Sequence, residues 1–198
     1  MKQQLLILAS GSAIRAQLLA RAGLSFSILR PAVDEAALKL EFHQATPTNL
    51  AARLAGAKAG DVSRRNPDAL VIGADQVLNF EGKAHDKPSS LAEARSQLLH
   101  FRGKTHALET SVTCCRGGKP LWSHAVHADL TMRDFSDSFL DAYLESLDED
   151  TLTSVGGYKL EERGIQLFSR IEGDYFGILG LPLLPLLAFL RSEGFIAS

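Results

Sequence analysis

The chain has 198 residues, which is enough for one domain with a sizeable core, and 45% of them are apolar against 22% charged. A formal net charge of −2 argues against a non-specific nucleic-acid binder, which normally carries a basic excess. A small anionic substrate stays compatible with this charge, because a few local cations can bind a triphosphate.

Neither end of the chain has the pattern of a targeting or membrane segment. The N-terminal apolar run is too short for the core of a signal peptide. The apolar stretch 178–190 contains two prolines and is shorter than the roughly 20 residues that a membrane span needs. We therefore expect a cytoplasmic protein with no membrane and no nucleic-acid partner.

The first half of the chain alternates strand and helix patterns. The expected elements are a buried strand over 5–9, a helix that stops near Gly23, a strand over 26–29, a helix over 49–64 and a short buried strand over 70–72. Ser12 is expected to cap the first of these helices and Thr48 the second, because both hydroxyl residues come directly before a helical pattern.

The second half combines helices with a hairpin. We expect a helix over 91–101, a hairpin of 106–115 and 121–132 around Gly117-Gly118, a helix opened by Ser136, a strand over 165–168 and a last helix over 183–193. The adjacent Cys114 and Cys115 are interpreted as small buried side chains, since neighbouring residues fit disulfide geometry poorly. The whole pattern indicates an α/β fold with a mixed β-sheet flanked by helices.

The junction between the first strand and the first helix is a candidate anion site. Gly11 lets another group approach the backbone, and the free amides that follow Ser12 favour an anion. Arg15 adds a full positive charge in the first turn of the helix. An ordinary capped helix after a buried strand explains the same residues, so this segment alone leaves both interpretations open.

Other charged residues stand at positions where ligands often bind. Asp75 follows the apolar run 70–72 and is expected at the carboxyl end of that strand, where it could hold Mg²⁺ or orient a water molecule. Pro88 keeps Lys87 extended, so that its ammonium could reach a phosphate. Lys58 on a helix and Glu35 in an acidic turn could add a cation and a metal ligand. Taken singly, each of these is also an ordinary turn or surface residue.

The order of these segments resembles the Maf family over nearly the whole chain. The matching blocks are 8–19 (Leu-Ala-Ser-Gly-Ser-Ala-Ile-Arg-Ala-Gln-Leu-Leu), Val33-Asp34-Glu35, Lys58-Ala59, 73–77 (Gly-Ala-Asp-Gln-Val), Lys87-Pro88, 102–106, 156–161 and 171–183. The ordered set is far more specific than any single block.

The resemblance implies one domain over residues 1–198, with a two-lobed architecture similar to inosine triphosphatase and a cleft between the lobes. It also implies hydrolysis of the α–β phosphoanhydride bond of a nucleoside triphosphate to a monophosphate and pyrophosphate, with Mg²⁺, Mn²⁺ or Co²⁺ as cofactor. Asp75 matches the proton acceptor, and with Glu35 it matches the metal ligands. The phosphate-binding positions of the family match Ser12, Arg15, Lys58 and Lys87. The family-level role is removal of damaged nucleotides.

Three positions bear on which base is recognised. The first arginine of the family motif is replaced by Ile14, and Gln76 and Glu161 stand where the pyrimidine branch has threonine and glutamine. A carboxylate only accepts hydrogen bonds, which suits the two adjacent donors of guanine and suits cationic 7-methylguanine still better. The combination is similar to the 7-methyl-GTP branch, although Glu161 could also simply face solvent.

Several alternatives stay open at this point. A dTTP- or UTP-type pyrophosphatase would share the same motifs, and the opening of the chain is faintly similar to nucleotidyltransferases. The family is also associated with inhibition of cell division, so a non-enzymatic role through partner binding is a further alternative. The oligomeric state is not determined by the sequence, and a homodimer is among the alternatives.

Overall fold

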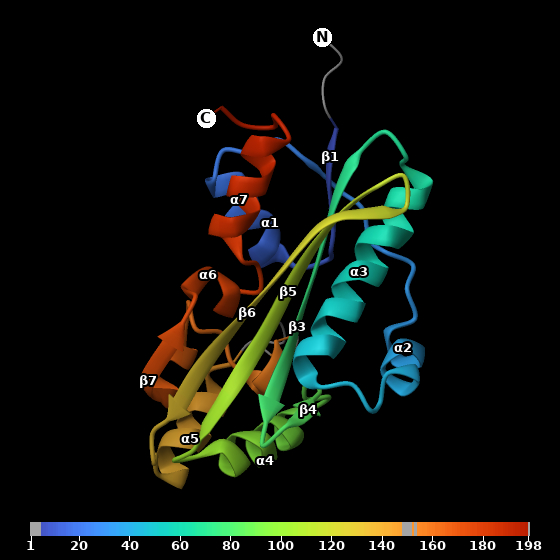
Figure 1. The fold of residues 1–198 in the computed structure, drawn as a ribbon. Helices are drawn as coiled ribbons and strands as arrows, with labels where there is room; N and C mark the ends of the chain where they lie inside the picture. The colour runs from blue at the N-terminus through green and yellow to red at the C-terminus, as the bar shows by residue number, and fades with distance from the viewer. Residues whose placement is uncertain (1–4, 148–151, 153, 198) are drawn as a thin grey trace.

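A computed structural model describes residues 5–147, 152 and 154–197. It contains a mixed seven-stranded sheet in which β2, β1, β3, β5, β6 and β7 follow one another, while β4 pairs with β3 (Figure 1). The strands are β1 (Leu6–Ala9), β2 (Ser27–Ile28), β3 (Leu70–Phe80), β4 (Lys83–His85), β5 (Thr105–Arg116), β6 (Lys119–Met132) and β7 (Phe168–Gly173). β1 is parallel to β2 and β3, and the other pairs are antiparallel. The predicted α/β class with a mixed sheet is confirmed.

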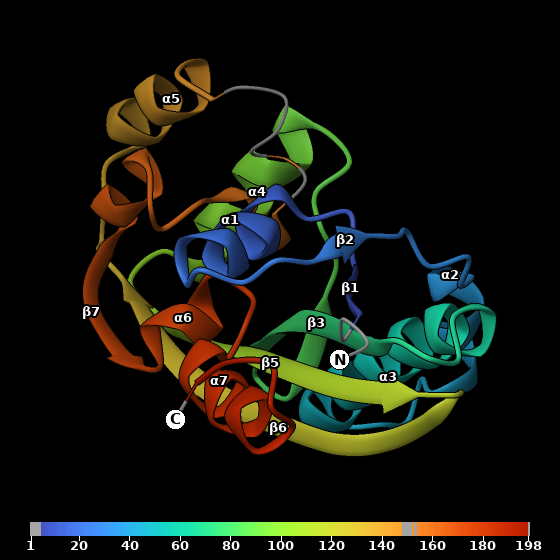
Figure 2. The same ribbon diagram turned by 90° about the horizontal axis from the view of Figure 1, so that it is seen from above.

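Helices cover both faces of this sheet. They are α1 (Ala13–Arg21), α2 (Glu35–Glu41), α3 (Pro47–Arg65), α4 (Leu91–Phe101), α5 (Asp137–Glu145), α6 (Tyr175–Ile178) and α7 (Leu183–Ser192), with the 3₁₀ helices η2 (Val155–Gly157) and η3 (Arg163–Leu167). The long helix α3 runs along one face, and α1 and α7 lie on the other (Figures 1 and 2). None of the described helices is long and apolar enough to cross a membrane.

Two large apolar clusters lie on the face opposite α3. One joins α1 and α7 to Leu8 of β1 and Ile72 of β3, and the other joins α4 and α5 to Leu78 further along β3. Both clusters are built on the same strand because alternate residues of a strand point to the same face. The two-lobed shape with a cleft that the resemblance implies stays an expectation.

Many elements lie where the sequence pattern predicts them. α4 spans Leu91–Phe101 as expected, β5 and β6 form the hairpin around Gly117-Gly118, and Ser136 caps α5. Gly23 has a φ of +80°, which suits a residue that ends a helix. Cys114 and Cys115 are free and buried.

Three local predictions are wrong. β3 continues to Phe80, so that Asp75 lies inside the strand and not at its carboxyl end, because β5 supplies backbone partners over the whole of 71–79. Thr46 caps α3 in place of Thr48, since Pro47 suits the first position of the helix. The expected strand over 165–168 is mostly η3, and β7 begins only at Phe168.

Candidate active site

The site begins with the close contact between α3 and β3. Gly73 lies so near to the helix that an added Cβ atom would be 2.5 Å from the carbonyl oxygen of Ala55 and 2.6 Å from the amide nitrogen of Ala59. This contact brings Lys58 over the strand, and its Nζ lies 2.6 Å from Oδ1 of Asp75. Both side chains are only 10% exposed, so the ion pair is largely removed from water.

Glu35 joins this pair from α2. Asp34 caps the helix by accepting a hydrogen bond from the amide of Ala37 at 3.0 Å, which fixes Glu35 at the first helical position. Oε1 of Glu35 lies 2.9 Å from Nζ of Lys58, and its side chain is half exposed. One ammonium therefore bridges two carboxylates that are 40 residues apart in the sequence.

Arg15 lies on the other side of β3, in the first turn of α1. β1 ends at Ala9, which pairs with Gly73, so the next carbonyl of β3 has no partner in β1. The guanidinium of Arg15 donates to that carbonyl of Ala74 at 2.8 Å and to the carbonyl of Gly180 at 2.7 Å. Burial lowers the pKa of Arg15, while the carboxylates of Asp75 and Glu35 act in the opposite direction.

Ser10 and Ser12 form the turn between β1 and α1. The backbone of Ser12 is at the N-cap position, as predicted, although its hydroxyl makes no capping hydrogen bond within the described structure. Its amide instead donates to Oγ of Ser10 at 3.1 Å, and Nη1 of Arg15 donates to the same oxygen at 3.3 Å. Ser10 therefore ties the turn to the arginine, a role that sequence reasoning did not assign.

Lys87 approaches the cluster from the segment after β4. The preceding Asp86 is ion-paired with Lys39 of α2, which ties this segment to the helix that carries Glu35. Loss of hydration around the amino end lowers the pKa of Lys87, and the charge of Arg15 lowers it further. The charges that act on Lys87 are those of the cluster itself, namely Arg15, Glu35, Lys58 and Asp75.

A cavity of about 420 Å³ opens on the face of α1 that carries Ile14, the residue before Arg15. Its lining residues are Ile14, Gln17, Leu18, Arg21, Ala22, Glu161, Tyr175, Phe176, Leu179 and Leu183. Two of the three predicted specificity positions, Ile14 and Glu161, thus come together here although 147 positions separate them. The volume is of the size that small-molecule sites have.

Gln76, the third predicted specificity position, is not part of the lining of this cavity. The two hydrogens of its Nε2 are shared among three acceptors, namely Oγ1 of Thr110 at 2.9 Å and the carbonyls of Gly177 at 2.9 Å and Ile178 at 3.0 Å. The side chain therefore holds α6, which forms one wall of the cavity.

Comparison with known proteins identifies the family of this chain. The family model described as Maf-like protein matches residues 5–193. The chain belongs to the Maf family. A 7-methyl-GTP pyrophosphatase of Rhizobium meliloti is 48% identical over 97% of this chain and 98% of its own length. A nucleoside triphosphate pyrophosphatase of Granulibacter bethesdensis is 51% identical over 95% of this chain and 96% of its own length. A 7-methyl-GTP pyrophosphatase of Brucella suis is 48% identical with the same coverage.

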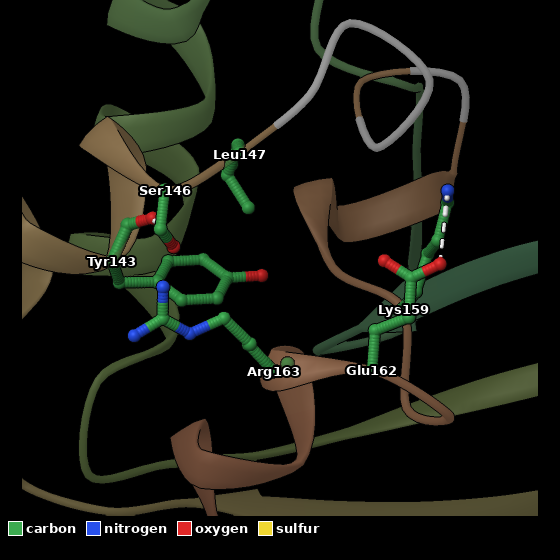
Figure 3. A pocket seen from close by; sticks show the side chains of 7 residues that line it. Tyr143, Ser146, Leu147, Lys159, Glu162 and Arg163 are labelled. Atoms are coloured by element: carbon green, nitrogen blue, oxygen red, sulfur yellow. Dashed lines mark hydrogen bonds and ion pairs between the residues drawn. The ribbon is translucent and has the colours of Figure 1, made fainter.

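A second, much smaller pocket of about 50 Å³ lies beside α5 (Figure 3). Tyr143 and Arg163 face it, and Nζ of Lys159 lies 3.4 Å from Oε1 of Glu162 at its side. This space suits a few water molecules and is too small for a nucleotide. The larger cavity beside Arg15 is the better candidate for substrate.

Two hydroxyl residues of the site escaped the sequence analysis. Ser10 is the first polar residue after the apolar run of β1, and Thr110 is buried in the middle of β5. The position of Ser10 in the first Maf-like block was a usable signal. Thr110 carries no such signal, because a threonine in a strand is common and only the register with β3 brings it to Gln76.

Proposed function

We propose that this Maf-family nucleoside triphosphate pyrophosphatase prefers guanine nucleotides, with 7-methyl-GTP as its best substrate. Hydrolysis of an acid anhydride follows from the family and from the names of the relatives. The finer preference is our inference. It rests mainly on one observation, namely that Glu161 and Ile14 line a cavity on the face of α1, while Arg15, the residue after Ile14, belongs to the cluster of cations around Asp75.

The cationic cluster would bind the triphosphate. Arg15, Lys58 and Lys87 come from three separate segments, and the charges of Arg15 and Lys58 lower the pKa of Lys87. Like charges that lie near one another repel, and an anion bound between them offsets that repulsion. Arg15 is also fixed by two backbone carbonyls, so its guanidinium needs little reorganisation when phosphate binds.

Glu35 and Asp75 fit the requirements of a divalent metal site. Both carboxylates contact the same ammonium of Lys58, so a cation is already held at the point where they converge. Mg²⁺ takes oxygen ligands, and in nucleotide sites it is usually held by one or two carboxylates together with phosphate oxygens. Among the described residues no group of three or more histidines, cysteines and carboxylates could hold a metal ion. A nucleotide would therefore have to complete the coordination. When bound, the metal would neutralise charge on the phosphates.

Asp75 is the residue best placed to act on water. Asp75 lies inside β3 with Oδ1 on the ammonium of Lys58, and the residue as a whole is 7% exposed. In the proposed reaction it orients a water molecule toward the α–β linkage and accepts its proton, while Lys58 and Arg15 stabilise the charge on the phosphates. The products are a nucleoside monophosphate and pyrophosphate.

The base would lie in the cavity beside α1. Glu161 supplies acceptor oxygens for the N1–H and amino donors of guanine, and the positive charge of 7-methylguanine strengthens that contact. Ile14 presents an apolar surface where the family motif has an arginine, which removes a cation that would repel a cationic base. Together these residues favour 7-methyl-GTP over pyrimidine nucleotides.

The proposal is tested with a panel of 7-methyl-GTP, GTP, dTTP and UTP, each assayed for pyrophosphate release with Mg²⁺, Mn²⁺ and Co²⁺. We expect the highest kcat/KM for 7-methyl-GTP and no turnover when a chelator removes the metal. Equal or better turnover of dTTP or UTP would overturn the base preference. Absence of pyrophosphate release from every nucleotide would overturn the activity itself and favour the partner-binding alternative.

Two variants assign the roles of individual carboxylates. Asp75→Asn should keep nucleotide binding and lose at least about a hundredfold in kcat, which is the usual contribution of a general base. Glu161→Gln should shift the preference toward pyrimidines, and the neighbouring Glu162→Gln is the matched control because Glu162 lines the small pocket instead. Full turnover by Asp75→Asn would show that Asp75 is not the general base. An identical nucleotide profile for both glutamine variants would show that Glu161 does not select the base.

A further inference from the structure

We infer that Thr110 is a positioning residue for base recognition, and that Thr110 and Gln76 together act by holding α6 against the sheet. The inference rests on the proposed base preference and deepens it. It assigns a role to a buried threonine that no motif marks. It also predicts that Gln76 influences specificity without touching the base.

The two side chains are paired across the sheet. Gln76 of β3 is the register partner of Thr110 of β5, and both point to the face opposite α3. Oγ1 of Thr110 accepts a hydrogen bond from Gln76 at 2.9 Å and donates one to the carbonyl of Gly177 at 2.9 Å. Since Thr110 is 1% exposed, water has little access to replace these bonds.

The bonds converge on the end of α6. Gln76 also donates to the carbonyls of Gly177 and Ile178, which lie in the last turn of this four-residue helix. So short a helix offers its own carbonyls few partners, and bonds from the sheet supply what the helix lacks. We call this set of bonds from Gln76 and Thr110 to Gly177 and Ile178 the α6 clamp.

Packing leaves α6 no room to shift toward the sheet. A Cβ atom added to Gly177 would lie 2.4 Å from Cγ2 of Val126 on β6. The helix is therefore held by its packing against β6 and by the α6 clamp from β3 and β5. Loss of the clamp leaves only movement away from the sheet, toward the cavity.

The segment that is held in this way forms both parts of the site. Tyr175, Phe176 and Leu179 line the base cavity, and the carbonyl of Gly180 accepts from Nε of Arg15 at 2.7 Å. A displacement of α6 would change the shape of the cavity where Glu161 faces the base. It would disturb the phosphate side less, because Arg15 is also anchored to Ala74 and Ser10. The clamp is therefore expected to affect discrimination between bases more than phosphate chemistry.

The test compares kcat and KM of three variants with 7-methyl-GTP and with UTP. Thr110→Val keeps the shape of the side chain and removes the hydroxyl, so we expect the ratio of the two kcat/KM values to fall about tenfold, mainly through KM for 7-methyl-GTP. Thr110→Ser keeps the hydroxyl and should restore the ratio. Thr113→Val is the matched control, because Thr113 is also buried in β5 but its hydroxyl bonds to Ser123 on the opposite face of the sheet.

Gln76→Met gives an independent measurement if Thr110→Val does not fold. It removes both amide donors at a half-buried position while it keeps the length of the side chain. Gln76→Met should lower the same ratio of kcat/KM values. The double variant with Thr110→Val and Gln76→Met should have a ratio no lower than that of either single variant, since both substitutions remove the same α6 clamp. An unchanged ratio in Thr110→Val together with a changed ratio in Gln76→Met would mean that Gln76 meets the base directly, and the inference would be wrong. The proposed function fails separately, if the unmodified protein releases no pyrophosphate from 7-methyl-GTP.

Discussion

Gly73 sets the distance between α3 and β3, and the substitution Gly73→Ala is expected to disrupt the active site through that distance. A Cβ atom at this position would lie 2.5 Å from the carbonyl oxygen of Ala55 and 2.6 and 2.8 Å from N and Cβ of Ala59. Carbon atoms in contact normally stay about 3.5 Å or more from their neighbours. Two of the three clashing atoms belong to the backbone of α3, so no side-chain rotation relieves the contact and the helix must withdraw by about 1 Å.

The withdrawal has two consequences of predictable size. Overpacking of this kind destabilises a protein by about 1–3 kcal/mol. Lys58 would move with the helix, and its 2.6 Å contact with Asp75 would lengthen beyond hydrogen-bonding distance. A misplacement of about 1 Å in a catalytic arrangement can cost on the order of a hundredfold in rate. We therefore expect Gly73→Ala to lower both the free energy of unfolding and kcat.

Gly56→Ala is the matched control for this experiment. Gly56 lies in the same helix, and an added Cβ atom there meets no atom of the described residues within 4 Å. It should raise the free energy of unfolding by roughly 0.5–1 kcal/mol, because alanine is the better helix former, and it should leave turnover unchanged. Urea denaturation and steady-state pyrophosphate release measure the two quantities. A Gly73→Ala protein with unaltered stability and unaltered kcat would refute the idea that this contact positions Lys58.

Two more predictions concern buried ionisable groups. Burial lowers the pKa of His106 to about 4, with His85 contributing. An unfolded histidine titrates near 6.5, so the contribution of His106 to the free energy of unfolding should be constant above pH 6.5 and should fall by about 3 kcal/mol as the pH drops to 4. Urea titrations at several pH values should show a steeper fall of the free energy of unfolding with decreasing pH in wild type than in His106→Gln. Parallel curves of this free energy against pH would contradict the prediction. Lys58→Met leaves the carboxylate of Asp75 buried without its cation and should cost about 3 kcal/mol, which the added change Asp75→Asn should largely restore. A single variant as stable as wild type would rule out this role for the pair.

The sequence predicts those helices and strands whose ends are set by residues close by in the chain. β1 is an uninterrupted apolar run, α4 begins after a serine cap, and the turn of the hairpin has two glycines. The extent of β3 could not be predicted in this way. Asp75 and Gln76 break the apolar run, and the strand continues through them only because β5 pairs with it from a distant part of the sequence.

The same distinction applies to the site. The contacts of Lys58 with Glu35 and Asp75 agree with the set of residues that the Maf-like blocks implied. The motifs do not predict the orientation of each side chain, since this depends on strand register and on packing. Gln76 illustrates this, because its motif position suggests contact with the base while its amide bonds to Thr110 and to α6.

One short segment of β3 separates the residue proposed for catalysis from the residue proposed to support base recognition. β1 pairs with this strand up to Gly73 and β4 pairs with it from Leu78 onward, so residues 74–77 have β5 on one side and, within the described part of the chain, an open edge on the other. Through that edge Arg15 reaches the carbonyl of Ala74. Neighbouring residues of a strand point to opposite faces. Asp75 therefore faces Lys58 on α3, while Gln76 faces α6 and the wall of the cavity. In the proposed function these two adjacent residues serve phosphate chemistry and base recognition respectively, and a one-residue change of register in β3 would exchange their places.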